Sequence, residues 1–321
     1  MHIFITGGAG YIGSHVVLEA LNRRYDVTVY DDLSTGNKGN IFPQSTFILG
    51  SILSYKTLSK AMNGNQFDAV IHLAASKDSG ESMLNPIKYC ENNIIGGYNL
   101  LKSCINYNIK NFIFSSSASV YGNPKYNPVD ELHPLEPLSF YGYTKLSIEQ
   151  CLKWYSDIYG LKYASLRYFN AAGYDVEGKV EFFDSNSRNL IPVVLETAKK
   201  RRPYVSIFGN QYNTSDGTGV RDFIHVTDLA KAHIDALEHI KTQNENLTIN
   251  LGSGKGFSVL EVIAEAEKVT RRNIPYKIEA FRKGDVGEIV ASNSLAKETI
   301  NWRMNNSGIR NIIESTWELY K

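Results

Sequence analysis

The sequence predicts an α/β fold in which a doubly wound parallel β-sheet is followed by a smaller α/β domain. In the first half of the 321 residues, short apolar runs alternate with segments of helical periodicity. Continuous apolar strands separated by helices are typical of a parallel sheet that is covered on both faces. After Asn170 the sequence becomes rich in Gly, Asn, Asp and Ser, around residues 170–189 and 209–219. We therefore expect domains at 1–169 and 170–321, with parts of 224–252 packing back on the first domain.

Each expected element corresponds to one stretch of this pattern. The apolar runs predict strands at His2–Thr6, Val27–Tyr30, Thr46–Leu49, Ala69–Leu73, Phe112–Ser116 and Ala164–Tyr168. Between them, helical patterns cover Tyr11–Arg23, Glu91–Tyr107 and Tyr141–Tyr159. In the second domain, Val226–Ile240 and Ser258–Thr270 are the regular helical segments.

Composition and charge exclude several classes of protein. The 34 basic and 33 acidic residues leave a net charge of +1, which gives no indication of a nucleic-acid or membrane partner. The three cysteines are scattered without a CxxC spacing, so we expect neither a disulfide framework nor a bound metal, and a cytoplasmic location fits best. No run of 18 apolar residues and no secretory signal pattern is found.

A glycine-rich turn follows the first strand. The segment Thr6-Gly-Gly-Ala-Gly-Tyr-Ile-Gly13 places glycines at 7, 10 and 13, where the first helix begins. Such glycines allow a tight turn and close backbone approach to a pyrophosphate, which the helix N-terminus can bind. The alternative is an ordinary turn between a strand and a helix. The context favours a dinucleotide site.

The second strand ends in acidic residues. Asp31 and Asp32 follow Tyr30, and a carboxylate there can bind the adenosine ribose hydroxyls while repelling a 2′-phosphate. This favours NAD over NADP, although an aspartate could also simply start a turn. Small residues at 73–77, after the fourth strand, would let a cofactor lie close, but tight packing explains them equally well.

A tyrosine and a lysine are spaced for joint chemistry. Tyr141 and Lys145 lie at i and i+4, one turn apart on a helix face. A phenol is a poor base near pH 7, but an ammonium and an oxidised nicotinamide would both favour its phenolate. Alone, the pair could equally occupy a solvated helix surface.

A serine-rich strand end supports the catalytic interpretation. Ser117 lies 24 residues before Tyr141, where the apolar run Phe112–Ser116 ends. Open α/β sheets bind ligands at the carboxyl ends of their strands, where a serine could relay a proton. Ser115–Ser117 alone would be an end-of-strand turn. Together with the glycines, Asp31, Tyr141 and Lys145 in this order, it predicts oxidation of an alcohol.

The chain resembles the extended short-chain dehydrogenase/reductase family, which has a Rossmann domain, and within it the UDP-galactose 4-epimerases. The resemblance runs nearly end to end, and Arg221-Asp-Phe-Ile-His-Val226 is more specific than the glycines. The matching segments are Gly7–Gly13, Asn92-Asn93, Asn111–Gly122, Tyr141–Lys145, Leu166–Asn170, Ile207–Asn210, Asp216–Val226, Asp228-Leu229 and Asn250–Gly252.

The resemblance implies a role for each site residue. Ser117, Tyr141 and Lys145 would be catalytic. NAD would bind to Gly7, Gly10, Tyr11, Ile12, Gly13, Asp31, Asp32, Ser51, Ile52, Leu73, Ala74, Ala75, Lys77, Asn92, Ser115, Tyr141, Lys145 and Tyr168. The UDP-sugar would bind to Lys77, Ser117, Tyr141, Phe169, Asn170, Asn189, Leu190, Phe208, Arg221, Arg282, Asp285 and Ile289. Without the family resemblance, Arg221 and Arg282 would each be interpreted as part of a surface salt bridge.

The implied reaction is interconversion of UDP-galactose and UDP-glucose through a 4-keto sugar, with tightly bound NAD, as in galactose metabolism. Related dehydratases and decarboxylases carry an acidic residue just after the catalytic hydroxyl, where this chain has Ala118 and Ser119. Alternatives are another UDP-sugar 4-epimerase, acting on UDP-GlcNAc, UDP-glucuronate or a UDP-pentose, or a catalytically silent NAD-sensing protein. The resemblance also implies a homodimer formed through Glu91–Tyr107 and Leu146–Tyr159.

Three positions depart from the family pattern. Gly50-Ser51-Ile52 replaces the usual Gly-Asp, so the adenine contact there is altered, and Ser292-Asn-Ser294 replaces an Asp-Ser-Lys stretch. Ile289 lies near the position where, in the family, a tyrosine limits room for the 2-substituent of the sugar. A smaller Ile289 favours tolerance of UDP-GlcNAc and UDP-GalNAc, unless this isoleucine is simply a core residue.

Overall fold

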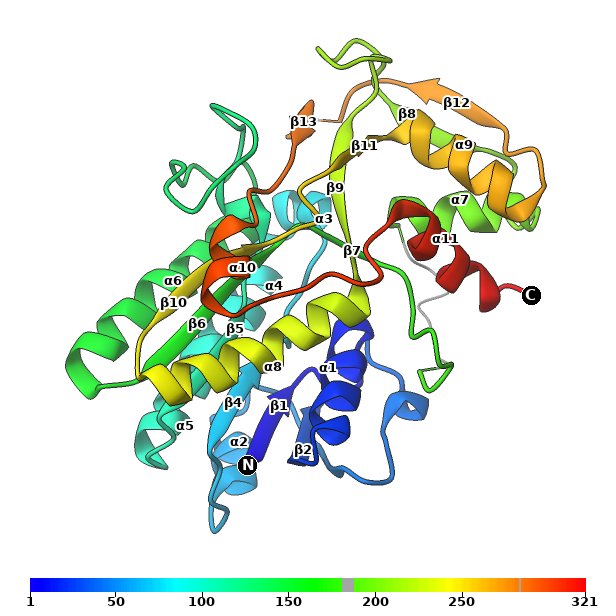
Figure 1. The fold of residues 1–321 in the computed structure, drawn as a ribbon. Helices are drawn as coiled ribbons and strands as arrows, with labels where there is room; N and C mark the ends of the chain where they lie inside the picture. The colour runs from blue at the N-terminus through cyan, green and yellow to red at the C-terminus, as the bar shows by residue number, and fades with distance from the viewer. Residues whose placement is uncertain (181–187, 283) are drawn as a thin grey trace.

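A seven-stranded parallel sheet forms the centre of the computed structural model, which describes residues 1–180, 188–282 and 284–321 (Figure 1). Its strand order is β10-β6-β5-β4-β1-β2-β3, so the chain starts in the middle and winds outward twice. The strands are β1 (His2–Thr6), β2 (Asp26–Asp31), β3 (Thr46–Leu49), β4 (Ala69–His72), β5 (Asn111–Ser115), β6 (Lys162–Tyr168) and β10 (Leu247–Leu251). The doubly wound α/β prediction is confirmed.

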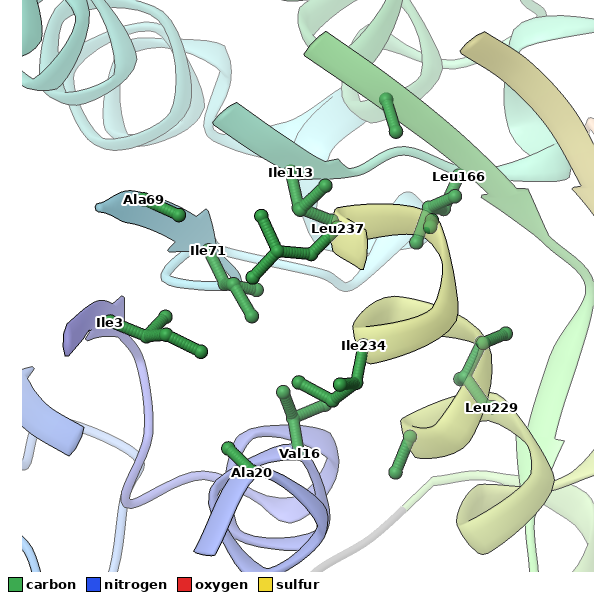
Figure 2. Packing of buried hydrophobic residues seen from close by; sticks show 14 of the residues in the cluster. Ile3, Val16, Ala20, Ala69, Ile71, Ile113, Leu166, Leu229, Ile234 and Leu237 are labelled. Carbon is green, nitrogen blue, oxygen red and sulfur yellow. The ribbon is translucent and has the colours of Figure 1, made fainter. Parts of the chain in front are cut away.

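Helices cover both faces of this sheet because its central strands, such as β1, are apolar on both sides. Ile3 and Ile5 of β1 pack toward α1 (Tyr11–Asn22) and α8 (Val226–Gln243), whereas Phe4 belongs to the opposite core. Figure 2 shows Leu237 of α8 beside Ile71 and Ile113 of the sheet, and Val16 of α1 next to Ile234 of α8. The opposite face carries α2 (Tyr55–Met62), α5 (Gly96–Asn106) and α6 (Phe140–Tyr159).

The second part of the chain has smaller sheets and its own core, and lies beyond the carboxyl ends of the strands (Figure 1). Strand β9 (Val220–His225) pairs with β7 (Asn170–Ala172), β11 (Gly256–Ser258) and β13 (Glu288–Ile289). Strand β8 (Val205–Phe208) pairs with β12 (Tyr276–Glu279). Helices α7 (Leu190–Ala198), α9 (Val259–Thr270) and α11 (Ile309–Glu318) enclose an apolar cluster that includes Val194, Ile263 and Ile313.

Several elements differ from those predicted. The strands at His2–Thr6 and Thr46–Leu49 have the predicted bounds. The predicted helix Glu91–Tyr107 is instead a π-helical segment, Cys90–Ile95, followed by α5. Strand β10 joins the sheet beside β6, and α8 packs against α1. The remaining short helices are α3 (Ser79–Leu84), α4 (Pro86–Tyr89) and α10 (Ser294–Thr299). Within the described ranges, no helix is both long and apolar enough to cross a membrane.

Candidate active site

The glycine turn between β1 and α1 leaves no room for side chains. Gly7 has a φ of +75°, and a Cβ there would lie 2.6 Å from the backbone nitrogen of Ala74. A Cβ on Gly13 would lie 2.0 Å from the oxygen of Gly7. Gly10 caps α1 without a side chain, so the first N–H groups of the helix have no side-chain acceptor at the cap. A helix N-terminus of this kind suits a pyrophosphate.

Residues at the start of α1 also tie the two parts of the chain together. The hydroxyl of Tyr11 donates to the oxygen of Gly173 at 2.6 Å, so its ring is engaged in packing. Ile12 packs against the core on the α1 face of the sheet. For these two predicted cofactor residues, the backbone N–H is the group that can face a ligand.

Asp31 lies at the carboxyl end of β2 and is 7% exposed. Its two carboxylate oxygens accept from the N–H groups of Ala9, at 3.0 Å, and Leu33, at 2.8 Å. Burial raises the pKa of Asp31, while these two hydrogen bonds act in the opposite direction. The residue predicted to bind ribose therefore also fixes the glycine turn.

Asp32 and Ser51 lie together beside this position. Burial alone would raise the pKa of Asp32, but hydrogen bonds from Ser34 and Ser51 lower it overall. The neighbouring Ile52 is buried and lies close enough to Gly96 that a Cβ there would be 2.6 Å from Ile52 Cδ1. The structure thus brings the two aspartates and the segment after β3 to one edge of the sheet.

The segment after β4 is held by an asparagine that was not singled out in the sequence. Leu73 and Ala74 donate their N–H groups to the oxygen of Thr6, both at 3.1 Å. Asn93 accepts from the N–H of Ser76 at 2.8 Å and donates to its oxygen at 3.0 Å. The predicted Asn92 instead donates to the Ser76 hydroxyl at 3.1 Å.

The rest of this segment is more open. Ala75 is partly buried, and Lys77 is exposed at its end. Asn93 also donates to Thr144 Oγ1 of α6 at 3.0 Å, so it joins the Leu73–Lys77 segment to the helix that bears Tyr141. The dipeptide Asn92-Asn93 was the available signal, but sequence alone does not tell which asparagine faces inward.

Tyr141, Lys145 and Ser117 lie together and are nearly buried. Their exposed fractions are 8%, 4% and 8%. Lys145 Nζ donates to the backbone oxygen of Ser115 at 2.8 Å and lies 5.8 Å from the centre of the Tyr141 ring. Ser117 Oγ donates to Ser119 Oγ at 3.1 Å. The start of α6 thus faces the carboxyl end of β5, as the sequence predicted.

The start of α6 is fixed by two hydroxyl groups. Ser139 caps the helix by accepting from the N–H of Gly142 at 3.1 Å. Ser82 Oγ accepts from the N–H of Tyr141 at 3.0 Å. These bonds hold the tyrosine at the first turn of the helix, where its side chain can reach Ser117.

The electrostatics of the pair differ from the prediction. Burial raises the pKa of Tyr141 to about 12, and the Ser117 hydroxyl offsets this only in part. Burial lowers the pKa of the Lys145 ammonium to about 7, against the opposing effect of Glu149. The expected lowering of the phenol pKa by Lys145 is therefore outweighed by desolvation.

Ser115 and Tyr168 border the same site from β5 and β6. Ser115 Oγ is hydrogen-bonded to His233 Nε2 at 2.8 Å. Burial raises the pKa of Tyr168 well above its usual range, and Tyr141 adds to this effect. Both residues lie at the carboxyl ends of their strands, and Lys145 Nζ meets the Ser115 backbone oxygen there.

A second group of predicted residues lies in the smaller domain. The Arg282 guanidinium lies 4.1 Å from the centre of the Phe208 ring, and its Nε lies 3.1 Å from Asp285 Oδ2. Burial lowers the pKa of Arg221, Asp285 opposes that effect and Arg282 adds to it. Burial and Asp285 raise the pKa of Tyr212, while Arg221 and Arg282 act in the opposite direction. The structure therefore brings Phe208, Arg221, Arg282 and Asp285 together.

Asp222 organises the loops around this group. Its carboxylate accepts from the N–H groups of Ser253, Gly254 and Ala291 at 2.7, 2.9 and 3.1 Å. Its backbone oxygen accepts from Asn170 Nδ2 at 2.9 Å. The sequence motif that contains Asp222 was recognised, but its role as a loop anchor required the fold.

Phe169 and Ile289 lie between the two groups. Both are 7% exposed and belong to one apolar cluster with Ala118 and Leu146. Ile289 pairs in register with Arg221, so its packing is that of a core residue next to the site. Asn189 precedes α7 and Leu190 begins it, and both lie beside residues 181–187, which are outside the described ranges.

Known proteins match this arrangement over the whole chain. The NAD dependent epimerase/dehydratase family model matches residues 3–252. A UDP-glucose 4-epimerase from Halalkalibacterium halodurans is 42% identical, over 100% of this chain and 96% of that protein.

Two solved structures are also similar. One is UDP-glucose 4-epimerase from Brucella ovis in complex with NAD, with a TM-score of 0.95, 39% identity, and coverage of 99% of this chain and 97% of that chain. The other is UDP-glucose 4-epimerase from Bifidobacterium longum in complex with NAD+ and UDP, with a TM-score of 0.94, 35% identity, and coverage of 99% and 98%. The chain belongs to the NAD dependent epimerase/dehydratase family and, within it, to the UDP-glucose 4-epimerases.

Proposed function

We propose that the protein is an NAD-dependent UDP-glucose 4-epimerase, which interconverts UDP-galactose and UDP-glucose. The observation that carries this proposal is that Tyr141, Lys145 and Ser117 lie together and nearly buried at the carboxyl end of β5. Full-length similarity to UDP-glucose 4-epimerases supports the same substrate.

The residues of the first domain fit NAD. The uncapped start of α1, together with the Gly7 and Gly13 positions that exclude a Cβ, gives a pyrophosphate access to backbone N–H groups. Asp31 retains acceptor capacity beyond its two backbone bonds and suits ribose hydroxyls. The proposed cofactor site is completed by residues at the ends of the neighbouring strands and in the segments after them: Ser51, Ile52, Leu73, Ala75, Lys77, Asn92, Ser115 and Tyr168.

The residues of the second domain fit the UDP part of the substrate. Arg221 and Arg282 supply charge for a diphosphate, to which guanidinium groups bind well. Phe208 offers an aromatic face. Asn170, Asn189, Leu190 and Asp285 would position the nucleotide around them. Phe169 would line the space for the hexose.

Catalysis then depends on proton transfer at C4 of the sugar. NAD held by the glycine turn, Asp31 and Lys145 would supply reversible oxidation at C4 of the sugar. Tyr141 takes and returns the proton of the 4-hydroxyl, and Ser117 holds that hydroxyl within reach. Because burial raises the pKa of Tyr141 to about 12, its ionisation requires nearby positive charge, which the Lys145 ammonium supplies.

A product analysis tests the proposal. Purified protein is supplied with UDP-galactose without added NAD, and the products are separated. We expect UDP-glucose and no accumulation of reduced cofactor. Stoichiometric reduced cofactor with an oxidised sugar would instead indicate a net dehydrogenase. Binding of UDP-galactose without any product would favour the alternative of a silent NAD-sensing protein.

The substrate range is a separate part of the proposal. Ile289 is smaller than the tyrosine of stricter relatives, so we infer that UDP-GalNAc and UDP-GlcNAc are also converted. Its packing with Phe169 supports the competing view that it only fills the core. Negligible turnover of UDP-GalNAc beside UDP-galactose would favour that view.

We further propose a homodimer. Apolar residues are exposed on the π-helical segment, on α5 and on α6, among them Ile95, Tyr98, Trp154 and Ile158. A second copy of the chain would cover them. Sedimentation velocity would detect a monomer if this interface were wrong.

We also propose the domain division expected from the sequence, in which residues 1–169 bind NAD and residues 170–321 bind the UDP-sugar. Three free cysteines are consistent with a cytoplasmic location.

A further inference from the structure

A buried carboxylate lies one helical turn beyond the catalytic lysine. Glu149 follows Lys145 at i+4 on α6, and both side chains are buried. The sequence alone suggests no role for Glu149. It is therefore an ionisable group next to the proposed catalytic pair that the reaction does not yet use.

Glu149 binds two different strands of the central sheet. Its Oε1 accepts from Ser116 Oγ at 2.5 Å. Its Oε2 accepts from Arg167 Nη2 at 2.7 Å, and Arg167 Nε also donates to Oε1 at 3.0 Å. The carboxylate is thus held by a forked guanidinium of β6 and by a hydroxyl at the end of β5.

The partner arginine is fixed in turn. Arg167 Nη1 donates to the Tyr121 hydroxyl at 3.0 Å, which donates to Asn250 Oδ1 of β10 at 2.6 Å. Both charges of the pair are therefore fully hydrogen-bonded. A buried ion pair of this kind adds little net stability compared with apolar residues of similar size. This makes a role other than stability the better explanation for its position.

The position relates directly to the catalytic segment. Lys145 bonds to the backbone of Ser115, and Glu149 bonds to the side chain of Ser116. One face of α6 thus forms hydrogen bonds with the two residues immediately before Ser117. Any shift of Glu149 would move Ser117 relative to Tyr141.

We propose that Glu149 is a positioning residue for catalysis: it fixes Ser115–Ser117 against α6 and places a buried negative charge one helical turn from Lys145. The inference rests on the proposed function of Tyr141 and Lys145. The assigned role is electrostatic as well as structural, and the two parts can be separated by experiment.

Other groups around Lys145 act differently. On β4, His72 would lower the pKa of Lys145 only if the His72 ring were charged. Burial lowers the pKa of His72 itself to about 3, so its ring is neutral near pH 7. From β5, Lys145 meets the Ser115 oxygen and the Phe114 ring. Other polar groups of this region include Tyr141 on α6, Arg167 and Tyr168 on β6, and His233 on α8. Glu149 is the group whose charge opposes the effect of burial on the Lys145 pKa.

The test is the Glu149→Gln variant, which keeps the shape of the side chain and removes its charge. Activity with UDP-galactose is measured across pH. We expect the alkaline limb of kcat/KM to move down by about one pH unit, because an opposite charge nearby shifts a pKa by about that much. KM at neutral pH should change less than about twofold. Asp157→Asn, which removes an exposed charge from the same helix, should match the parent protein.

A readout without substrate separates this inference from the proposed function. The ¹³Cε resonance of Lys145, identified by its loss in Lys145→Met, is titrated in both proteins. It should titrate at lower pH in Glu149→Gln. If the parent protein proved not to be an epimerase, this titration would still decide the electrostatic claim.

Two further variants guard against misfolding. Glu149→Gln combined with Arg167→Gln removes both buried charges and should show a smaller downward shift, because the lost positive charge of Arg167 acts in the opposite direction. Glu149→Asp keeps the charge but withdraws the carboxylate, so the alkaline limb should stay in place while kcat falls several-fold. Folded charge-removing variants with an unmoved alkaline limb and an unmoved Lys145 titration would overturn the proposal.

Discussion

Asp31 Oδ2 accepts a hydrogen bond from the backbone N–H of Ala9 at 3.0 Å. The end of β2 is thereby joined to the middle of the glycine turn. A residue expected only to recognise ribose thus also holds the backbone that is expected to bind the pyrophosphate. We therefore propose that this one carboxylate links cofactor selectivity to cofactor affinity.

Replacing Asp31 by Asn should weaken NAD binding by about tenfold or more. Both carboxylate oxygens accept backbone N–H groups, so an amide must present its NH₂ to one of those donors. Losing a hydrogen bond to a charged group costs about 1.5–3 kcal/mol, and about 1.4 kcal/mol corresponds to tenfold. Titration calorimetry of NAD into stripped protein measures this. Asp26→Asn, at the exposed start of the same strand, is the control. A dissociation constant within twofold of the parent value would contradict the linkage.

Replacing Tyr141 by Phe should lower kcat by about 10²–10⁴-fold, which is the usual contribution of a positioned general acid or base. The ring and its packing are retained, so binding of UDP should change little. Tyr143→Phe is the matched control, because Tyr143 lies on the same helix with 51% of its surface exposed. Steady-state kinetics and UDP calorimetry give both quantities. A Tyr141→Phe enzyme within tenfold of the parent kcat would remove Tyr141 from its proposed role.

Replacing Arg282 by Ala should raise KM for UDP-galactose by about 10–100-fold, since charge-assisted bonds to phosphate are worth about 1.5–3 kcal/mol. The side chain lies over Phe208 and is proposed to bind the diphosphate rather than the reacting carbon, so kcat should fall much less than kcat/KM. Arg303→Ala, at another exposed arginine, should leave both constants unchanged. An equal loss in kcat and kcat/KM would place Arg282 in the chemical step.

The sequence predicted the sheet better than the elements around it. Strands such as His2–Thr6 are buried on both faces and therefore form continuous apolar runs. The ends of such a run mark the ends of the strand, so the predicted bounds were accurate. Strand β10 was not predicted, because its partner β6 comes from 83 residues earlier in the chain, as the pairing of Leu247 with Ala164 shows. Helix α11 is similarly defined by packing against the α7–α9 core.

The site could be predicted as a set of residues but not as a network. Tyr141, Lys145 and Ser117 follow from spacing, because a turn of helix and a strand end have fixed geometry. The roles of Asn93 and Asp222 could not be deduced, since each binds backbone groups from distant loops. The raised pKa of Tyr141 depends on burial, which a spacing pattern does not report.

A buried histidine should make the fold sensitive to acid. His233 on α8 bonds to Ser115 Oγ and, through Nδ1, to the oxygen of Leu229 at 2.8 Å. Burial lowers its pKa to about 4, below the usual value of 6.5. Between these pH values the unfolded chain binds more protons than the folded one. The stability associated with neutral His233 is therefore full above about pH 6.5 and is lost as the pH falls toward 4.

Replacing His233 by Gln should reduce this acid sensitivity. Each proton taken up only by the unfolded state costs at most about 1.4 kcal/mol per pH unit. Urea unfolding at pH 7.5 and 5.0 gives the loss of unfolding free energy for each protein. His233→Gln lowers stability at pH 7.5 by removing two hydrogen bonds, but its further loss on going to pH 5.0 should be smaller than that of the parent. His239→Gln, at a partly exposed position on the same helix, should lose as much as the parent does. The same pH-dependent loss in His233→Gln as in the parent would mean that His233 does not contribute to acid unfolding, and that His15, His72 and His225, whose pKa values burial also lowers, account for it.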